Sequence, residues 1–218
     1  MKKSHPFTPD FDSLPGALSV FPLAGCVLLP LAQLQLNIFE PRYLNMVFDA
    51  LGAGRLIGVA QPNPAVGDGQ TLYDTGCVGR ITTFSETVDG RLLISLSGVC
   101  RFMLAGEIAP VRGYRRFKVD WTPFESDMHE HEIAVDTALL MVILGDFFRV
   151  QNIKADMDSL KKMPGAVLVN SLATNLPFPA IDKQSLVEAE TLSERMNVLM
   201  ALAQMSIAER GESGIVRH

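Results

Sequence analysis

Cysteine is scarce in this chain, which has three cysteines among 218 residues: Cys26, Cys77 and Cys100. Their number is odd, their spacings are wide and no CxxC pair occurs. The sequence therefore lacks both the framework of a disulfide-rich secreted domain and the ligand spacing of a structural zinc site. Each cysteine stands among apolar residues. We expect three free, buried thiols in a reducing, cytoplasmic compartment.

The chain also lacks the short motifs of common enzyme chemistry. It has no GxxxxGK[ST] phosphate loop, no GxSxG nucleophile elbow and no HExxH zinc helix. One polar run does gather metal-ligand types: Asp127, His129, Glu130, His131 and Glu132. On a helix only Asp127 and His131 would share a face, and on a strand His129 and His131 would lack a third ligand. We interpret the run as a polar linker before a helix, and we expect no metal, no cofactor and no enzyme activity.

Positive charge and long apolar runs are limited as well. The net charge is −5, which argues against a general nucleic-acid binder. The densest basic cluster, which we interpret as a solvated strand and turn face, comprises Arg112, Arg115, Arg116 and Lys118. The apolar stretch 20–39 is interrupted by prolines, a glycine and amide side chains. Polar amide side chains are costly to bury in a membrane. We therefore expect neither nucleic acid nor membrane as a partner.

What the chain does have is enough apolar sequence, 48% of its residues, for a substantial core. Its first half has the period of two that is typical of strands, most clearly at 33–38. A helix is predicted over 40–51, with a proline in its first turn and apolar residues at helical spacing. An Asp-Gly turn predicts a hairpin between 79–84 and 91–96. Further strands are predicted at 18–23, 27–30, 56–60, 99–104 and 114–121. So many strands with one helix indicate a small, partly closed barrel.

The second half has the periodicity of helices. Helices are predicted over 133–150 and 165–173, followed by a short helix capped by Asp182. A final helix begins at a capping box of Thr191 and Glu194. We predict a flexible N-terminus at 1–14, a β-rich domain at 15–123, a linker at 124–132, a helical bundle at 133–210 and a flexible tail at 211–218. The two domains are expected to be separate packing units.

Several segments, taken in order, resemble one known family, the N-terminal substrate-binding domain of Lon proteases in its stand-alone bacterial form. They are 21–23, 27–30, 34–43, 76–81, 89–92, 98–102, 186–189 and 192–195. The resemblance implies an α+β fold, in which an N-terminal PUA-like pseudo-β-barrel with one or two helices precedes a C-terminal α-helical bundle. It implies binding of polypeptide clients or partner proteins, without the ATPase and protease domains, and it supplies no catalytic residues.

The candidate site residues are Glu40, Arg42, Tyr43 and Arg80. We interpret them first as structural: Glu40 would cap the helix that follows it and pair with Arg80. A binding role stays open. The first functional hypothesis is a non-catalytic polypeptide binder, which accepts an extended strand along an open sheet edge. The alternative is a small-molecule binder or unrecognised enzyme that uses a cleft between the two domains. A third, RNA binding, rests on the PUA-like analogy and is opposed by the charge. The oligomeric state is left open.

Overall fold

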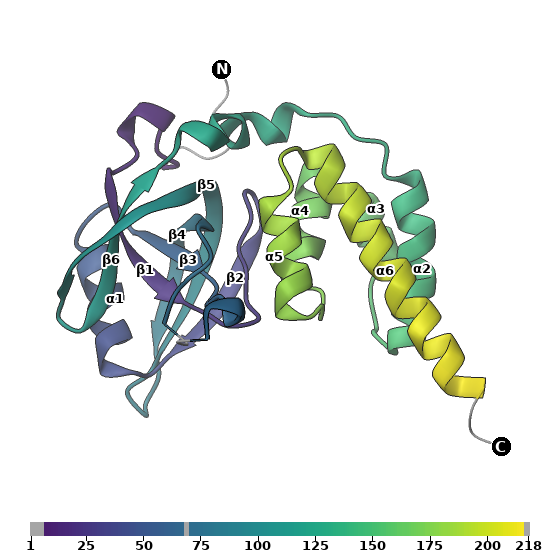
Figure 1. Cartoon of the computed structure of the whole chain (residues 1–218), viewed down its shortest axis with the longest axis horizontal. Helices are drawn as coiled ribbons and strands as arrows, with labels where there is room; N and C mark the ends of the chain where they lie inside the picture. Colours follow the sequence, from purple (N-terminus) through teal and green to yellow (C-terminus); the bar gives the residue numbers. More distant parts are fainter. Residues whose placement is uncertain (1–6, 68–69, 216–218) are drawn as a thin grey trace.

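The computed structural model describes residues 7–67 and 70–215. A sheet-rich part comes first and a helical part follows it (Figure 1). The sheet-rich part comprises η1 (Phe11–Ser13), β1 (Ala17–Pro22), β2 (Gln33–Ile38), α1 (Pro41–Leu51), β3 (Leu56–Ala60), η2 (Pro64–Val66), β4 (Thr75–Glu86), β5 (Leu92–Val111) and β6 (Tyr114–Asp120). It is followed by η3 (Thr122–Glu132), α2 (Ala138–Gln151), α3 (Met157–Lys161), α4 (Gly165–Asn175), α5 (Ala180–Glu188) and α6 (Leu192–Ile215).

The predictions for the two ends of the chain are only partly covered by this description. Residues 1–6 and 216–218, both predicted to be flexible, lie outside the described ranges. Residues 211–215, which the sequence analysis assigned to a flexible tail, belong to helix α6. The proposed division into domains, with its cut at 124–132, stays a prediction.

The six strands form one mixed sheet that closes on itself. Their order is β2-β5-β4-β3-β1-β6, and an additional pairing joins β5 to β6. The 20-residue strand β5 makes this closure possible. Its first part pairs with β2, its second part pairs with β6, and β4 runs along its other edge. The result is an α+β fold in which β5 is the one strand among residues 7–67 and 70–215 that pairs with β2.

The strand predicted at 27–30 is wrong. Gly25 and Leu31 have positive φ angles of 72° and 64°, so the chain turns on both sides of this segment, and residues 27–30 belong to no strand. Leu28 and Leu29 are nevertheless buried, because the segment crosses the sheet at two glycines. A Cβ on Gly98 would lie 1.9 Å from the Leu29 carbonyl oxygen, and one on Gly79 would lie 2.5 Å from a Leu28 methyl carbon.

One hydrophobic core runs through both parts of the chain. It includes Leu28 and Leu96 from the sheet side together with Leu140, Leu168 and Leu186 from the helices. The helices arch away from the sheet in Figure 1, with α5 nearest to it and α2 and α6 packed against each other. The sequence predicted two separate packing units, whereas the structure shows a shared core.

The helix boundaries show where local signals were sufficient. The Thr191 hydroxyl accepts a hydrogen bond from the backbone N–H of Glu194 at 3.1 Å, which confirms the predicted cap. Asp182 does not cap α5, because that helix begins two residues earlier, after Pro179. The short helix α3 was not predicted, since five residues are too few to show a helical period.

Candidate functional site

A cleft of about 550 Å³ opens where β2 gives way to α1. Its apolar wall is formed in part by Phe21, Phe39 and Tyr43. Ile38, the last residue of β2, is buried, so the alternation of the strand directs the next side chain outward, and Phe39 is 60% exposed. Tyr43 lies in the first turn of α1, and its ring centroid is 4.1 Å from that of Phe21. The cleft therefore offers one exposed aromatic ring beside a packed aromatic pair.

Two guanidinium–carboxylate pairs stand at the rim of this cleft. Arg42 contacts Glu40 through Nε at 3.0 Å and through Nη2 at 2.8 Å, and its Cζ lies 4.6 Å from the centre of the Tyr43 ring. Arg115 binds both carboxylate oxygens of Glu107 at 2.7 Å and donates to the Gln70 carbonyl at 2.6 Å. The rim thus carries both signs of charge in fixed positions.

The ionisation of these groups follows from their surroundings. Hydrogen bonding from Arg115 lowers the pKa of Glu107 below its ordinary value, so this carboxylate stays ionised at neutral pH. Burial raises the pKa of the Tyr43 phenol above 10.0, an effect that Arg42 opposes. Tyr43 is therefore neutral at physiological pH and contributes an apolar ring with a hydroxyl donor.

Three of the four candidate residues from the sequence line the cleft, namely Glu40, Arg42 and Tyr43. Arg80 does not: it lies on β4, and its guanidinium carbon is 5.4 Å from the centre of the Phe7 ring. The predicted pairing of Glu40 with Arg80 is wrong, since the carboxylate of Glu40 pairs with Arg42. The predicted cap is wrong as well, because the Glu40 side chain makes no capping hydrogen bond to α1.

Replacing Glu40 with alanine should change the free energy of unfolding by less than about 1 kcal/mol, because the Glu40–Arg42 pair is solvent-exposed. Urea denaturation followed by circular dichroism measures this change. A loss of several kcal/mol would restore the buried, architectural role that the sequence suggested for this residue.

Some residues of the cleft were missed in the sequence analysis. Phe39 could have been found from the alternation of β2, which directs a large aromatic side chain outward directly after the strand. Leu72, Gln70 and Arg115 come from segments far away in the sequence. No local pattern indicates that they meet the start of α1.

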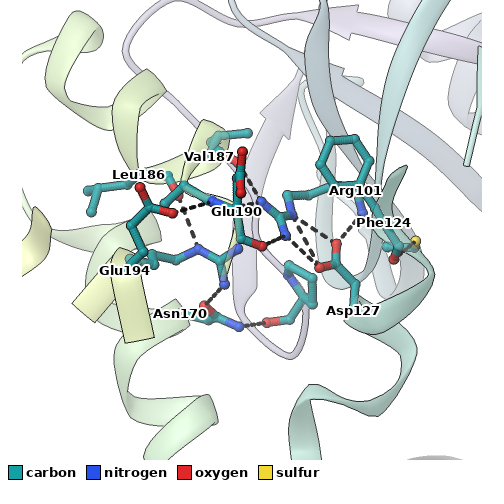
Figure 2. A network of polar contacts seen from close by, with 12 residues as sticks. Arg101, Phe124, Asp127, Asn170, Leu186, Val187, Glu190 and Glu194 are labelled. Atoms are coloured by element: carbon teal, nitrogen blue, oxygen red, sulfur yellow. Dashed lines mark hydrogen bonds and ion pairs between the residues drawn. The ribbon is translucent and has the colours of Figure 1, made fainter. Parts of the chain in front are cut away.

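A buried ion pair joins the sheet to the helical part (Figure 2). Arg101 on β5 contacts Asp127 of η3 at 2.8 Å, and the two side chains are 1% and 0% exposed. The guanidinium also donates to the carbonyls of Val187 and Glu190 at 3.0 and 3.2 Å, and it lies over the ring of Phe124. The interpretation of Asp127 as part of a polar linker before a helix is therefore wrong; its carboxylate is the buried partner of Arg101. The same polar run includes Glu130, His131 and Glu132, whose side chains lie outside the described residues.

A second arginine, Arg195, extends these buried polar contacts further into the helical part. Arg195 on α6 donates to the carbonyl of Leu186 at 3.0 Å and to the side-chain oxygen of Asn170 at 2.7 Å. Asn170 in turn donates to the carbonyl of Pro30 at 2.9 Å, so the chain of contacts returns to the segment before β2 (Figure 2). We interpret both arginines as structural, because their donors point to backbone carbonyls and buried side chains.

The contact between sheet and helices leaves little room for a ligand. Gln61 after β3 and Gln184 on α5 are buried and joined by a hydrogen bond of 3.1 Å. Around them, Cys26, Cys77 and Val187 line a gap whose volume for a water-sized molecule is about 0 Å³. This gap gives no support to a small-molecule site or an active site between the two parts.

The thiols differ in their exposure. Cys77 and Cys100 are buried thiols, as the sequence predicted, whereas Cys26 is only half-buried, which corrects the expectation for this residue. Burial raises the pKa of Cys77 well above 9.0, so its thiol stays protonated at neutral pH. Within residues 7–67 and 70–215, no three His, Cys, Asp or Glu side chains are grouped so as to hold a metal ion. Nor does any helix in these ranges have the length and apolar character to cross a membrane.

Comparison with known sequences decides the family. Residues 17–204 match the family described as "ATP-dependent protease La (LON) substrate-binding domain". The chain belongs to the Lon substrate-binding domain family. Among curated proteins it is 28% identical over 209 residues to Lon protease 2 of Sorangium cellulosum, a match that covers 90% of this chain and 25% of that protease. It is also 28% identical over 203 residues to the Lon protease of Parabacteroides distasonis, covering 87% of this chain and 24% of the relative.

The chain thus spans about a quarter of the length of these Lon proteases. The match lies in their substrate-binding domain and does not extend to their ATPase or protease domains. Solved structures agree with this assignment. The crystal structure of the Lon N-terminal domain protein from Xanthomonas campestris has a TM-score of 0.59 and 27% identity, over 85% of this chain and 97% of that one. The N-terminal domain of a Mycobacterium avium complex Lon protease shows the same fold, with a TM-score of 0.58 and 12% identity over 86% of this chain and 98% of that one.

Proposed function

We propose that this Lon substrate-binding domain is a non-catalytic module that binds unfolded or extended polypeptide segments in the cleft between β2 and α1. The observation that carries the proposal is the composition of that cleft. It sets the exposed ring of Phe39 beside Tyr43, and it holds Arg42 and Arg115 at the rim. Apolar side chains of an unfolded segment are buried against aromatic rings, and its carbonyls meet guanidinium donors. The description of the family supports the class of ligand.

The remaining parts of the proposal follow from the family. We infer that the closed sheet is of the PUA-like pseudo-barrel type and that helices α2–α6 are the family's helical bundle. We also infer that the protein works in the cytoplasm, where unfolded polypeptides would be its clients. Neither ATP nor a bound cofactor takes part in this binding.

Phe39→Ser should weaken binding of an unfolded polypeptide about tenfold, which corresponds to ~1.4 kcal/mol, because the variant removes the exposed ring of the cleft. The probe is reduced, carboxymethylated α-lactalbumin with a fluorescent label, and its anisotropy is followed as the domain is added. Phe39 is solvent-exposed, so its replacement should leave the free energy of unfolding unchanged within about 0.5 kcal/mol.

Phe48→Ser is the matched control. Phe48 lies on α1, is 48% exposed and does not line the cleft, so its replacement should leave the affinity unchanged within about twofold. If both variants bind like the wild type, the cleft is not the polypeptide site. If the wild-type domain does not bind the unfolded probe, the proposed function itself is wrong.

A further inference from the structure

Strand β2 has a strand neighbour on one edge only. It pairs with β5, with Gln35 opposite Ser95, and no strand among the described residues pairs with its other edge. The direction of its backbone groups can be fixed from the turn before it. Gly98 donates its N–H to the carbonyl of Ala32 at 2.9 Å and accepts from the N–H of Leu31 at 3.0 Å. The backbone groups of Gly98 therefore face β2.

Along an antiparallel pair, hydrogen-bonded and non-bonded residue pairs alternate. Counting from Gly98, every second residue of β5 down to Leu92 faces β2, and the residues between them face β4. An independent contact agrees, since the Thr82 hydroxyl on β4 donates to the Ser95 carbonyl at 3.2 Å. It follows that the N–H and C=O groups of Gln35 and Asn37 point away from β5, toward the unpaired edge.

This edge lacks several of the usual protections. Natural edge strands are commonly protected by charged side chains, proline or a β-bulge, whereas β2 has the sequence QLQLNI and pairs with β5 without a register shift. At its start, the Gln33 carbonyl accepts a hydrogen bond of 3.4 Å from the side chain of Asn175 on α4. From Gln35 onward, no partner for the outward backbone groups is found in the described part of the chain, and both Gln35 and Asn37 are exposed.

We propose that the free edge of β2 binds an extended segment of an unfolded polypeptide as an additional strand. This inference rests on the proposed function and specifies its binding mode. Outward N–H and C=O groups at alternate residues are complementary to another extended backbone, and strand addition is an established mode of peptide recognition.

The edge leads directly into the candidate cleft. Asn37 lines both the cleft of about 550 Å³ and an open groove of about 440 Å³ over β2, β4 and β5. A strand added at Gln35 and Asn37 continues toward Phe39, so backbone hydrogen bonds position the segment while the cleft holds its apolar side chains. The ligand class is therefore an extended segment that has no proline at the positions whose N–H groups face β2. Recognition depends little on its sequence, because the edge binds backbone groups.

Hydrogen exchange tests this binding mode without any substitution. In the free domain the amides of Gln35 and Asn37 should exchange fast, and those of Leu34 and Leu36 slowly, because only the latter bond to β5. When carboxymethylated α-lactalbumin binds, the exchange rates of the Gln35 and Asn37 amides should fall at least about tenfold. Residue-resolved NMR measures these rates. A complex in which these two amides stay fast would overturn strand addition while leaving polypeptide binding intact.

A pair of variants gives a second readout. Gln35→Pro removes an outward N–H and leaves the hydrogen bonds between β2 and β5 in place. It should weaken binding of the probe at least about tenfold. Gln35→Thr keeps the N–H and should bind within about twofold of the wild type. Equal binding by the folded proline variant would contradict the proposal.

Protection of the Gln35 and Asn37 amides in the free domain, together with a dimeric mass, would assign the edge to a second copy of the chain and also overturn the proposal. If the probe does not bind at all, the proposed function fails together with this inference.

Discussion

Replacing Asp127 with alanine should lower the free energy of unfolding by about 3–5 kcal/mol, because the guanidinium of Arg101 then stays buried without its carboxylate. The expected loss is a large fraction of the ~5–15 kcal/mol that stabilises a typical domain. Urea denaturation monitored by the fluorescence of Trp121 measures the change. The ring centroid of Trp121 lies 5.9 Å from that of Phe102.

A surface carboxylate provides the control for this prediction. Asp158 lies 3.7 Å from Lys161 in an exposed pair, and its replacement with alanine should cost less than about 1 kcal/mol. Replacing both Arg101 and Asp127 with apolar residues of similar size should recover part of the lost stability, since no unpaired charge is left at this position, while the carbonyls of Val187 and Glu190 lose their donor. An Asp127→Ala variant as stable as the Asp158→Ala control would contradict the buried joint between sheet and helices.

Gly98→Ala should destabilise the domain by about 3 kcal/mol or more, since the added methyl group would lie 1.9 Å from the carbonyl oxygen of Leu29. A backbone atom cannot move aside as the end of a flexible side chain can. Moving the Leu29 segment also disturbs the hydrogen bonds of Gly98 to Leu31 and Ala32. The same urea experiment measures the loss, and a reduced yield of soluble protein should accompany it.

Gly145→Ala is the matched control for the glycine prediction. Gly145 lies inside α2, and apart from its chain neighbours and the nearby backbone of its own helix no described atom lies within 4 Å of a Cβ placed there. Alanine is the better helix former, so this variant should be more stable than the wild type by up to about 1 kcal/mol. If Gly98→Ala kept wild-type stability, the close crossing of the 27–30 segment over β5 would be wrong.

Local patterns in the sequence predicted much of the fold. The alternation of residues 33–38 predicted β2, and a proline before helically spaced apolar residues predicted α1, which begins at Pro41. These elements depend on contacts within a few residues, so their signals are local. The change from strand-like to helical periodicity predicted the order of a sheet-rich part and a helical part, and the resemblance to the Lon family implied the same order.

Long-range pairing could not be predicted in the same way. Asp127 was interpreted as part of a polar linker because its neighbours are polar, but its partner Arg101 lies 26 residues earlier. The carbonyls that Arg101 binds lie 86 to 89 residues later. A charged side chain surrounded by polar sequence gives no sign of a buried partner so far away.

The candidate site shows the same limit. Glu40, Arg42 and Tyr43 are close in sequence and were proposed together, and the structure places all three in the cleft. Arg80 was joined to them by an expected ion pair, which the structure replaces with the local pair of Glu40 and Arg42. Glu40 and Arg42 are two residues apart in the chain, so their side chains can pair locally. The distance between Glu40 and Arg80 on β4 depends on how the whole sheet is arranged, which local sequence does not show.

A photo-crosslinking map tests the central claim most directly. Carboxymethylated α-lactalbumin that carries a photoreactive group is mixed with the domain and irradiated, and the crosslinked residues are identified by mass spectrometry. The cleft and the β2 edge predict crosslinks at Gln35, Asn37, Phe39 and Tyr43. Crosslinks confined to Leu139 and Val142, which are 61% and 66% exposed on α2, would place the polypeptide on the helices and contradict the assignment of the cleft.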